Sequence, residues 1–204
     1  PFAGNAEPSP DLVETIVNKS EGLFLYVDWV RQELANGRLS LNEPDKFPQG
    51  LGGIYAGFFR RYFPDPEKYA ATYRPLLEAI CAAREPLETA YVANLFGWSV
   101  YSRNQIVSAL GSLFPVDGGH VRPFHQSVRD WLTDDSRAGD YFASVAEGHK
   151  RLAEYGWLQF QKGVAAMPRY SVVHLPAHLG AVPDREDDLR KLLLDFEWVQ
   201  AKLN

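Results

Sequence analysis

The sequence of 204 residues has little cysteine, little methionine and no long hydrophobic run. Its single cysteine cannot form an internal disulfide, and Cys81 lies in the apolar stretch LLEAICAA, where a buried thiol behaves as a small hydrophobic side chain. The longest apolar stretch, LFLYVDWV, is interrupted by Asp28 and is far shorter than the roughly 20 residues that cross a bilayer. We therefore expect a cytoplasmic protein without a membrane helix or a membrane partner.

The sequence also lacks the common motifs of catalytic sites. It has no GxxxxGKS/T phosphate loop, no GxSxG elbow, no CxxC pair and no HExxH zinc motif, so no enzyme activity is expected of this chain. His174 and His178 are four residues apart, as a metal pair on one helical face would be, but Pro176 lies between them and no third ligand is evident. Structural packing is the favoured interpretation. His149 is expected at the surface beside a glutamate.

The charge balance argues against nucleic acid as a partner. A net charge of -5 and a pI near 5.6 do not fit broad contact with phosphate backbones, which depends on clustered basic residues. Arg103, Asn104 and Gln105 are of types that read base edges, and they begin what would be a recognition helix. The adjacent hairpin adds only His120 and Arg122. A DNA-binding protein therefore stays open as an alternative only.

Residues 1–63 are predicted to form a first helical domain with a connector. The sequence begins with Pro1 and its only methionine is Met167, so we expect it to be part of a longer protein. Ser9 and Pro10 are typical of a helix start, and a second helix is predicted to follow a break near residues 20–22 and to end at Gly37. Prolines and glycines make residues 38–53 a connector, and helical spacing resumes at IYAGFFRRYF.

Residues 64–137 are predicted to form a winged helix-turn-helix. The helix YRPLLEAICAA has an apolar face at Tyr73, Leu76, Leu77 and Ile80, Pro86 is expected to open a short helix, and Ser102 with Gln105 fits a capping box at the start of the next one. In FPVDGGHVRPF, Asp117 and Gly118 suit the tight turn of a hairpin wing. The last helix, HQSVRDWL, should bury Phe124, Val128 and Leu132.

Residues 138–204 are predicted to form a second helical domain. Three helical segments, YFASVAEGHKRLAEYGWLQFQ, YSVVHLPAHLGAV and REDDLRKLLLDFEWVQAKL, are separated by residues 163–168 and 183–184. The predicted fold class is therefore mainly α: a helical lid segment, a winged helix with a small β-hairpin wing, and a helical array.

The order of these pieces resembles the middle of a STAND-class signalling NTPase of the NACHT type, whose C-terminus carries WD40 or similar repeats. The resemblance rests on KSEGLFLYVDWV, FPQGLGGIYAGFFRR, REPLETAYVANLFG, RPFHQSVRDWL and HLPAHL, in that order over nearly the whole chain. It implies a regulatory, autoinhibitory segment of an ATP/ADP-operated switch. The nucleotide-binding domain and the repeats would be its intramolecular partners, ADP or ATP with magnesium would bind the full-length protein, and activation would produce a homo-oligomer.

The resemblance implies two nucleotide contacts. The winged-helix histidine that reaches the β-phosphate of ADP falls on His125, followed here by Gln126 where the best-known motif has aspartate. A Gly-x-Pro turn near the adenine falls on Gly22, Leu23 and Phe24, with phenylalanine in place of proline. Independently of the family, a histidine at a helix start can donate to a phosphate oxygen, or it can simply cap the helix. A protein-interaction scaffold that uses aromatic anchors, 13% of the residues, is a further alternative.

Overall fold

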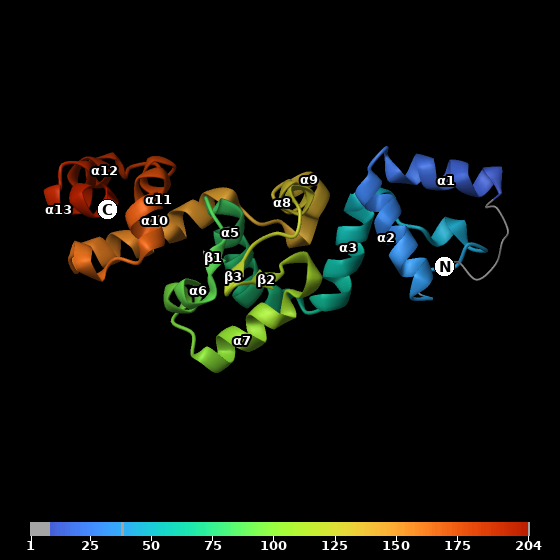
Figure 1. The fold of residues 1–204 in the computed structure, drawn as a ribbon, viewed down its shortest axis with the longest axis horizontal. Coiled ribbons are helices and arrows are strands. Elements are labelled where there is room, and N and C mark those ends of the chain that lie inside the picture. The colour runs from blue at the N-terminus through green and yellow to red at the C-terminus, as the bar shows by residue number, and fades with distance from the viewer. Residues whose placement is uncertain (1–8, 38, 204) are drawn as a thin grey trace. The chain divides into compact units, whose positions relative to one another are not determined.

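The computed structural model describes residues 9–37 and 39–203 and is mainly helical, with one small sheet (Figure 1). This confirms the mainly α fold class. The chain divides into two compact units, of which the first ends at Arg61 and the second begins at Tyr62. The predicted division into 1–63, 64–137 and 138–204 stays a prediction, and its residues 1–8 lie outside the described residues. Each unit is described separately below.

The first unit contains α1 (Pro10–Ser20), α2 (Phe24–Ala35), the short 3-10 helix η1 (Pro44–Lys46) and most of α3 (Gly50–Tyr62). The Ser9 side chain accepts a hydrogen bond from the Leu12 amide, and Pro10 is the first helical residue, as predicted. The Tyr26 hydroxyl donates to the Pro48 carbonyl at 2.6 Å, which fixes the connector against α2. Helix α3 begins at Gly50, so the predicted connector was four residues too long.

The second unit begins with a nearly continuous helical segment made of α4 (Pro66–Lys68), the π-helical η2 (Tyr69–Tyr73) and α5 (Arg74–Ala82). The Asp65 carboxylate caps α4 by accepting from the Lys68 amide. The predicted apolar face of α5 is confirmed, because Tyr73, Leu76, Leu77 and Ile80 are all buried.

The next segment differs from its prediction at both helix starts. Pro86 does not open a helix. Strand β1 (Leu87–Glu88) follows it, and α6 (Thr89–Phe96) begins directly after the strand. The capping box at Ser102 and Gln105 was also wrong, because α7 (Val100–Ala109) begins earlier and the Ser99 hydroxyl accepts from the Ser102 amide. Gln105 donates instead to the Tyr101 hydroxyl.

A hairpin and β1 form the small sheet. Its strands β2 (Val116–Asp117) and β3 (His120–Val121) follow the 3-10 helix η3 (Gly111–Leu113), and the antiparallel order is β1-β3-β2. Asp117 pairs with His120, so the turn residues are Gly118 and Gly119 rather than Asp117 and Gly118. Both glycines have positive φ, as a two-residue hairpin turn requires.

The chain then returns across α5. Helix α8 (Gln126–Leu132) buries Val128 and Leu132 as predicted, but Phe124 is 57% exposed. The short α9 (Asp135–Ala138) and η4 (Gly139–Tyr141) lead to α10 (Val145–Gln161), which packs along α5 (Figure 1). The Arg129 side chain donates from Nε to the Cys81 carbonyl at 2.7 Å, so α8 is also fixed to α5.

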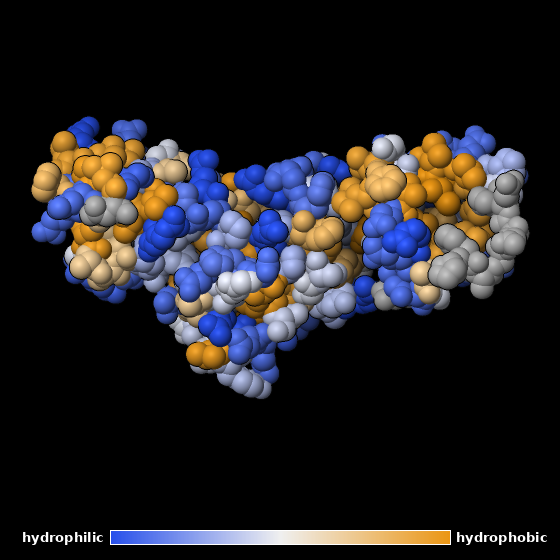
Figure 2. Space-filling model, viewed as in Figure 1, coloured by the Kyte–Doolittle hydropathy of each residue, from blue (hydrophilic) through white to orange (hydrophobic). Residues whose placement is uncertain are grey.

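The C-terminal helices follow α10. After η5 (Val164–Ala166) come α11 (Arg169–Gly180), α12 (Glu186–Leu193) and α13 (Phe196–Leu203), so the third predicted helix is divided at Leu194 and Asp195. Helix α11 packs on α10, while α12 and α13 pack on α11. Their shared core contains six buried residues: Ala153, Met167, Leu175, Leu179, Leu192 and Trp198. Apolar side chains remain exposed over α12 and α13 (Figure 2), among them Leu194 at 79% and Phe196 at 78%. Over residues 9–37 and 39–203, no helix has both the length and the apolar character that crossing a membrane demands.

Candidate functional site

His125 lies at the start of α8 and caps it. Its Nδ1 accepts a hydrogen bond from the Ser127 amide at 3.1 Å and lies 2.7 Å from the Ser127 hydroxyl. The side chain is exposed. The capping role that the sequence left open is therefore present.

The cap determines which ring nitrogen of His125 carries the proton. Because Nδ1 accepts from a backbone N–H, the neutral imidazole must carry its hydrogen on Nε2. Capping and donation to an anion are thus compatible, since one nitrogen serves the helix and the other remains a donor at the surface.

Gly22, Leu23 and Phe24 form the turn between α1 and α2. Glu21 and Gly22 both have positive φ, and the Leu23 amide donates to the Ser20 carbonyl. Phe24 begins α2 with 83% of its side chain exposed, and Leu23 is 43% exposed. The turn therefore presents two apolar side chains to solvent. It belongs to the first unit, whereas His125 belongs to the second.

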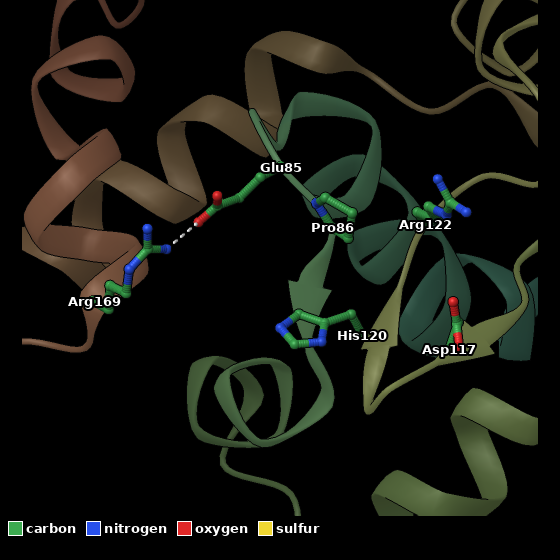
Figure 3. A pocket seen from close by; sticks show the side chains of 6 residues that line it. All are labelled: Glu85, Pro86, Asp117, His120, Arg122 and Arg169. Atoms are coloured by element: carbon green, nitrogen blue, oxygen red, sulfur yellow. Dashed lines mark hydrogen bonds and ion pairs between the residues drawn. The ribbon is translucent and has the colours of Figure 1, made fainter.

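A polar pocket of about 280 Å³ is lined by residues that precede β1, by residues of the hairpin and by one residue of α11 (Figure 3). Asp117 and His120 pair across the hairpin, and the Arg169 guanidinium lies 3.3 Å from the Glu85 carboxylate. The lining groups carry both signs of charge. They are Glu85, Pro86, Asp117, His120, Arg122 and Arg169.

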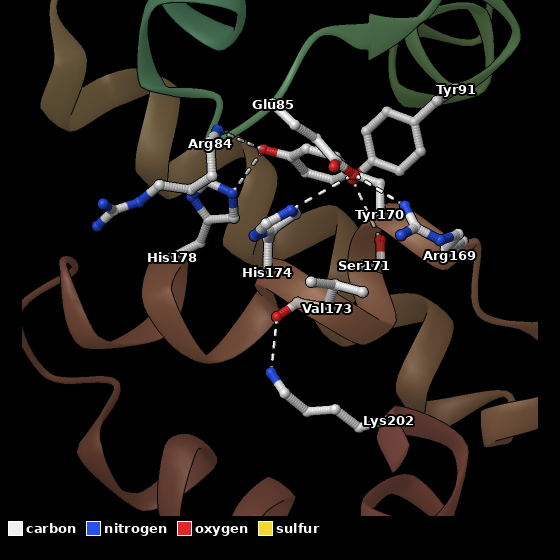
Figure 4. Close-up of polar contacts among 10 residues, drawn as sticks. All are labelled: Arg84, Glu85, Tyr91, Arg169, Tyr170, Ser171, Val173, His174, His178 and Lys202. Carbon is white, nitrogen blue, oxygen red and sulfur yellow. Dashed lines mark hydrogen bonds and ion pairs between the residues drawn. The ribbon is translucent and has the colours of Figure 1, made fainter. Parts of the chain in front are cut away.

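A chain of polar contacts with a buried centre, which we call the relay, joins α11 to two other parts of the second unit. It consists of Arg84, Tyr170, His178 and His149. The Arg84 amide donates to the Tyr170 hydroxyl at 3.3 Å, and that hydroxyl lies 2.9 Å from His178 Nε2 (Figure 4). On the other side of the ring, His178 Nδ1 lies 2.8 Å from Nδ1 of His149 on α10.

The relay is in a strongly desolvated environment. His178 is 1% exposed, and burial, reinforced by the nearby His149, His174 and Arg84, lowers the pKa of His178 to about 3. Burial also lowers the pKa of His149, with Arg84 and Arg129 acting in the same direction. Burial raises the pKa of the Tyr170 hydroxyl. Both histidines are therefore neutral at pH 7.

A second set of polar contacts lies beside the relay. Glu85 pairs with Arg169 and is 3.4 Å from Nε2 of His174, and the Tyr91 and Ser171 hydroxyls are 3.1 Å apart (Figure 4). Burial lowers the pKa of His174 in spite of the opposing effect of Glu85. Helix α11 thus meets segment 84–91 mainly through polar and ionisable groups.

His178 is buried and hydrogen-bonded, whereas His149 does not lie where the sequence predicted. His149 contacts His178 rather than a surface glutamate. Among the residues that the structure describes, no three His, Cys, Asp or Glu side chains come together as a possible metal site. Tyr170 and Arg84 were not predicted from the sequence. The spacing of residues 170, 174 and 178 by four was the available signal for Tyr170.

Arg103, Asn104 and Gln105 lie on α7 and contact one another or their neighbours. The Arg103 guanidinium donates twice to the Asn104 side-chain oxygen, at 3.1 and 2.9 Å. Arg103 is the only lysine or arginine in α7. A basic surface of the kind that binds DNA backbones is therefore not assembled by α7.

Comparisons of the chain with models of protein families, with curated proteins and with solved structures find no match. The resemblance to signalling NTPases therefore rests on the residues alone.

Proposed function

We propose that the chain is a non-catalytic regulatory segment of an ATP/ADP-operated switch of the STAND type, acting in the cytoplasm. In this proposal α5, β1, α6, α7, β2 and β3 form a winged helix, since helix, strand, two helices and a hairpin follow one another in that order. A nucleotide-binding domain and a C-terminal repeat sensor would be its partners within the full-length protein, and activation would produce a homo-oligomer.

The observation that carries the proposal is the orientation of His125. Its Nδ1 is engaged with Ser127, which leaves the Nε2–H of this exposed side chain as a donor for a phosphate oxygen. A phosphate contact made only in the closed, ADP-bound state would stabilise that state by its own free energy. The exposed Phe24 and Leu23 could contact an adenine ring in the same way, through apolar surface.

The residues of this chain fit a nucleotide only in part. His125 would contribute one donor to a phosphate, but the sequence contains no phosphate loop of its own. The chemistry of phosphoryl transfer and the magnesium site would thus belong to the nucleotide-binding domain. In this chain, the winged helix would only sense which nucleotide is bound.

The first test is the reading frame that encodes the chain. We expect a GxxxxGKS/T phosphate loop followed by an acidic strand within a few hundred residues upstream of Pro1. A frame without them removes the proposal.

The second test separates capping from anion binding in the longest protein that this frame encodes. Asparagine is a good N-cap, so His125→Asn keeps the cap of α8 while removing the imidazole donor. Loss of one hydrogen bond to a charged group corresponds to roughly tenfold to hundredfold weaker ADP binding. The matched control is His120→Asn, which changes another exposed histidine of the same unit. Equal ADP retention by both variants, measured by chromatography of the released nucleotide, contradicts the assignment.

The alternative of a winged-helix DNA-binding protein has a direct test. The low basic charge of α7 and of the hairpin predicts no salt-sensitive binding to duplex DNA. Binding that weakens steeply with added salt would favour that alternative over the switch.

A further inference from the structure

The relay has one arrangement that satisfies all of its hydrogen bonds. The Arg84 amide can only donate, so the Tyr170 oxygen accepts from it. The Tyr170 O–H then donates to His178 Nε2, and the neutral His178 donates from Nδ1 to His149 Nδ1. The donors thus all point one way, from Arg84 toward His149.

Addition of a proton to either histidine breaks this order. A proton on His149 Nδ1 places two N–H donors face to face across 2.8 Å. If His178 then exchanges its tautomer, its Nε2–H points at the Tyr170 oxygen, and the Tyr170 O–H loses its acceptor. A buried hydroxyl without a partner costs about 1–3 kcal/mol in folded proteins.

The charges around the relay oppose protonation from every side. Arg84 precedes β1, Arg129 projects from α8, and His174 lies on α11 itself, and all three act against a positive charge on the relay histidines. Of the acidic groups nearby, Glu85 pairs with Arg169 and His174, and Glu78 on α5 lies 3.9 Å from Arg151 of α10. Lys202 of α13 opposes protonation of His174.

The relay also lies on α11, the helix through which α12 and α13 are joined to α10. Helices α12 and α13 pack on α11 and on the segment around η5, and α11 in turn packs on α10. The contacts between α11 and segment 84–91 include the Arg84–Tyr170 hydrogen bond of the relay, the Glu85 ion pairs, the Tyr91–Ser171 hydrogen bond and the tilted rings of Tyr91 and Tyr170.

We propose that the relay is an acid-sensitive latch, which holds α11, and with it α12 and α13, against α10 and segment 84–91 at neutral pH and releases them on acidification. The latch does not depend on the nucleotide-switch proposal. The folded form binds fewer protons than the opened one, because the pKa of His178 lies below the ordinary value of about 6.5. The latch is therefore closed above pH 6.5 and weakens as the pH falls below it.

Amide hydrogen exchange of the 204-residue chain, measured by mass spectrometry at pH 7.5 and 5.5, tests the latch. Labelling times are scaled so that the chemical exchange rates match. One histidine that is neutral in the closed form and has an ordinary pKa in the open form changes the opening equilibrium about tenfold over this range. We expect residues 169–203 to exchange about tenfold faster at pH 5.5, and α5 and α7 to be unchanged.

Two variants and a control locate the effect. His178→Gln removes the titrating group, so the ratio of the exchange rates of residues 169–203 at pH 5.5 and pH 7.5 should fall about tenfold. His149→Gln, at the partly exposed end of the relay, should also lower it and serves if His178→Gln does not fold. His120→Gln, an exposed histidine outside the relay, should leave it unchanged. Three results overturn the proposal. Residues 169–203 exchange equally fast at both pH values, exchange accelerates uniformly over the whole second unit, or the relay variants keep the wild-type ratio of exchange rates between pH 5.5 and 7.5.

Discussion

Gly148 marks the closest approach of α10 to α5, and Gly148→Ala is the sharpest available test of the second unit's packing. A Cβ atom at this position would lie 2.1 Å from the Glu78 carbonyl oxygen and 2.7 Å from Cβ of Ala82. Ordinary contact begins at 3.4 Å, so the two helices would have to separate by about 1.3 Å, the difference between 3.4 and 2.1 Å. Because the nearest atom is backbone, no side-chain rotation relieves the overlap.

Two opposing contributions determine how much Gly148→Ala changes the free energy of unfolding. Replacing glycine by alanine inside a helix stabilises it by about 1 kcal/mol. Forcing an extra carbon into a close-packed interior costs about 1–3 kcal/mol and more when backbone must move. Since α5 and α10 form the main packing of the second unit, the second term wins, and we expect the free energy of unfolding to fall by about 2 kcal/mol.

Gly156→Ala is the matched control, because Gly156 lies in the same helix and has the same propensity gain. Its Cβ would meet Cδ1 of Leu175 at 2.8 Å, which is the far end of a side chain that can rotate. Urea denaturation followed by circular dichroism compares the two variants. Gly156→Ala should stay within about 1 kcal/mol of the wild type. If Gly148→Ala is as stable as Gly156→Ala, the close crossing of α5 and α10 is wrong.

The other predictions concern a helix cap and a thiol. Ser99→Ala should lower the free energy of unfolding by about 1 kcal/mol because it removes the cap of α7, whereas Ser102→Ala should change it little. Urea denaturation measures both variants. A larger loss of stability in Ser102→Ala than in Ser99→Ala would support the capping box at Ser102. Burial raises the pKa of the Cys81 thiol to about 12. Native protein at pH 8 should therefore not react with a thiol reagent until denaturant is added. Rapid labelling of the native protein would show that α5 is exposed.

The helices of the chain were predictable where their signals are local. Ser9 and Pro10 define the start of α1, and the apolar spacing of Tyr73, Leu76 and Leu77 defines the buried face of α5. The groups of the cap lie within three residues of one another, and the apolar spacing of α5 repeats within four residues, so both signals can be read from a short stretch of sequence.

The errors at β1 and α7 have a different cause. Leu87 and Glu88 form a strand only because Val121 and His120 lie beside them, and the Thr89 amide donates to the Gly119 carbonyl thirty residues away. Ser99 and Ser102 are equally good caps from their types alone. The Trp98 amide, which donates to the Ala93 carbonyl, ends the preceding turn early and leaves Ser99 to begin α7. A tertiary contact decided the boundary at β1, and a local backbone hydrogen bond that residue types do not reveal decided the boundary at α7.

Local and distant contacts also differ in how well they could be predicted at His125 and His178. His125 and Ser127 are two residues apart, so the sequence already offered capping as one of two roles. His178 contacts Tyr170 on its own helix, but His149 is 29 residues away, and Tyr170 reaches Arg84 at a distance of 86 residues. Spacing by four places Tyr170, His174 and His178 on one face of α11, yet a periodic pattern cannot say which groups cover that face. At His178 the covering groups are the neutral imidazole of His149 and the hydroxyl of Tyr170, and this is what makes that end of the face sensitive to acid.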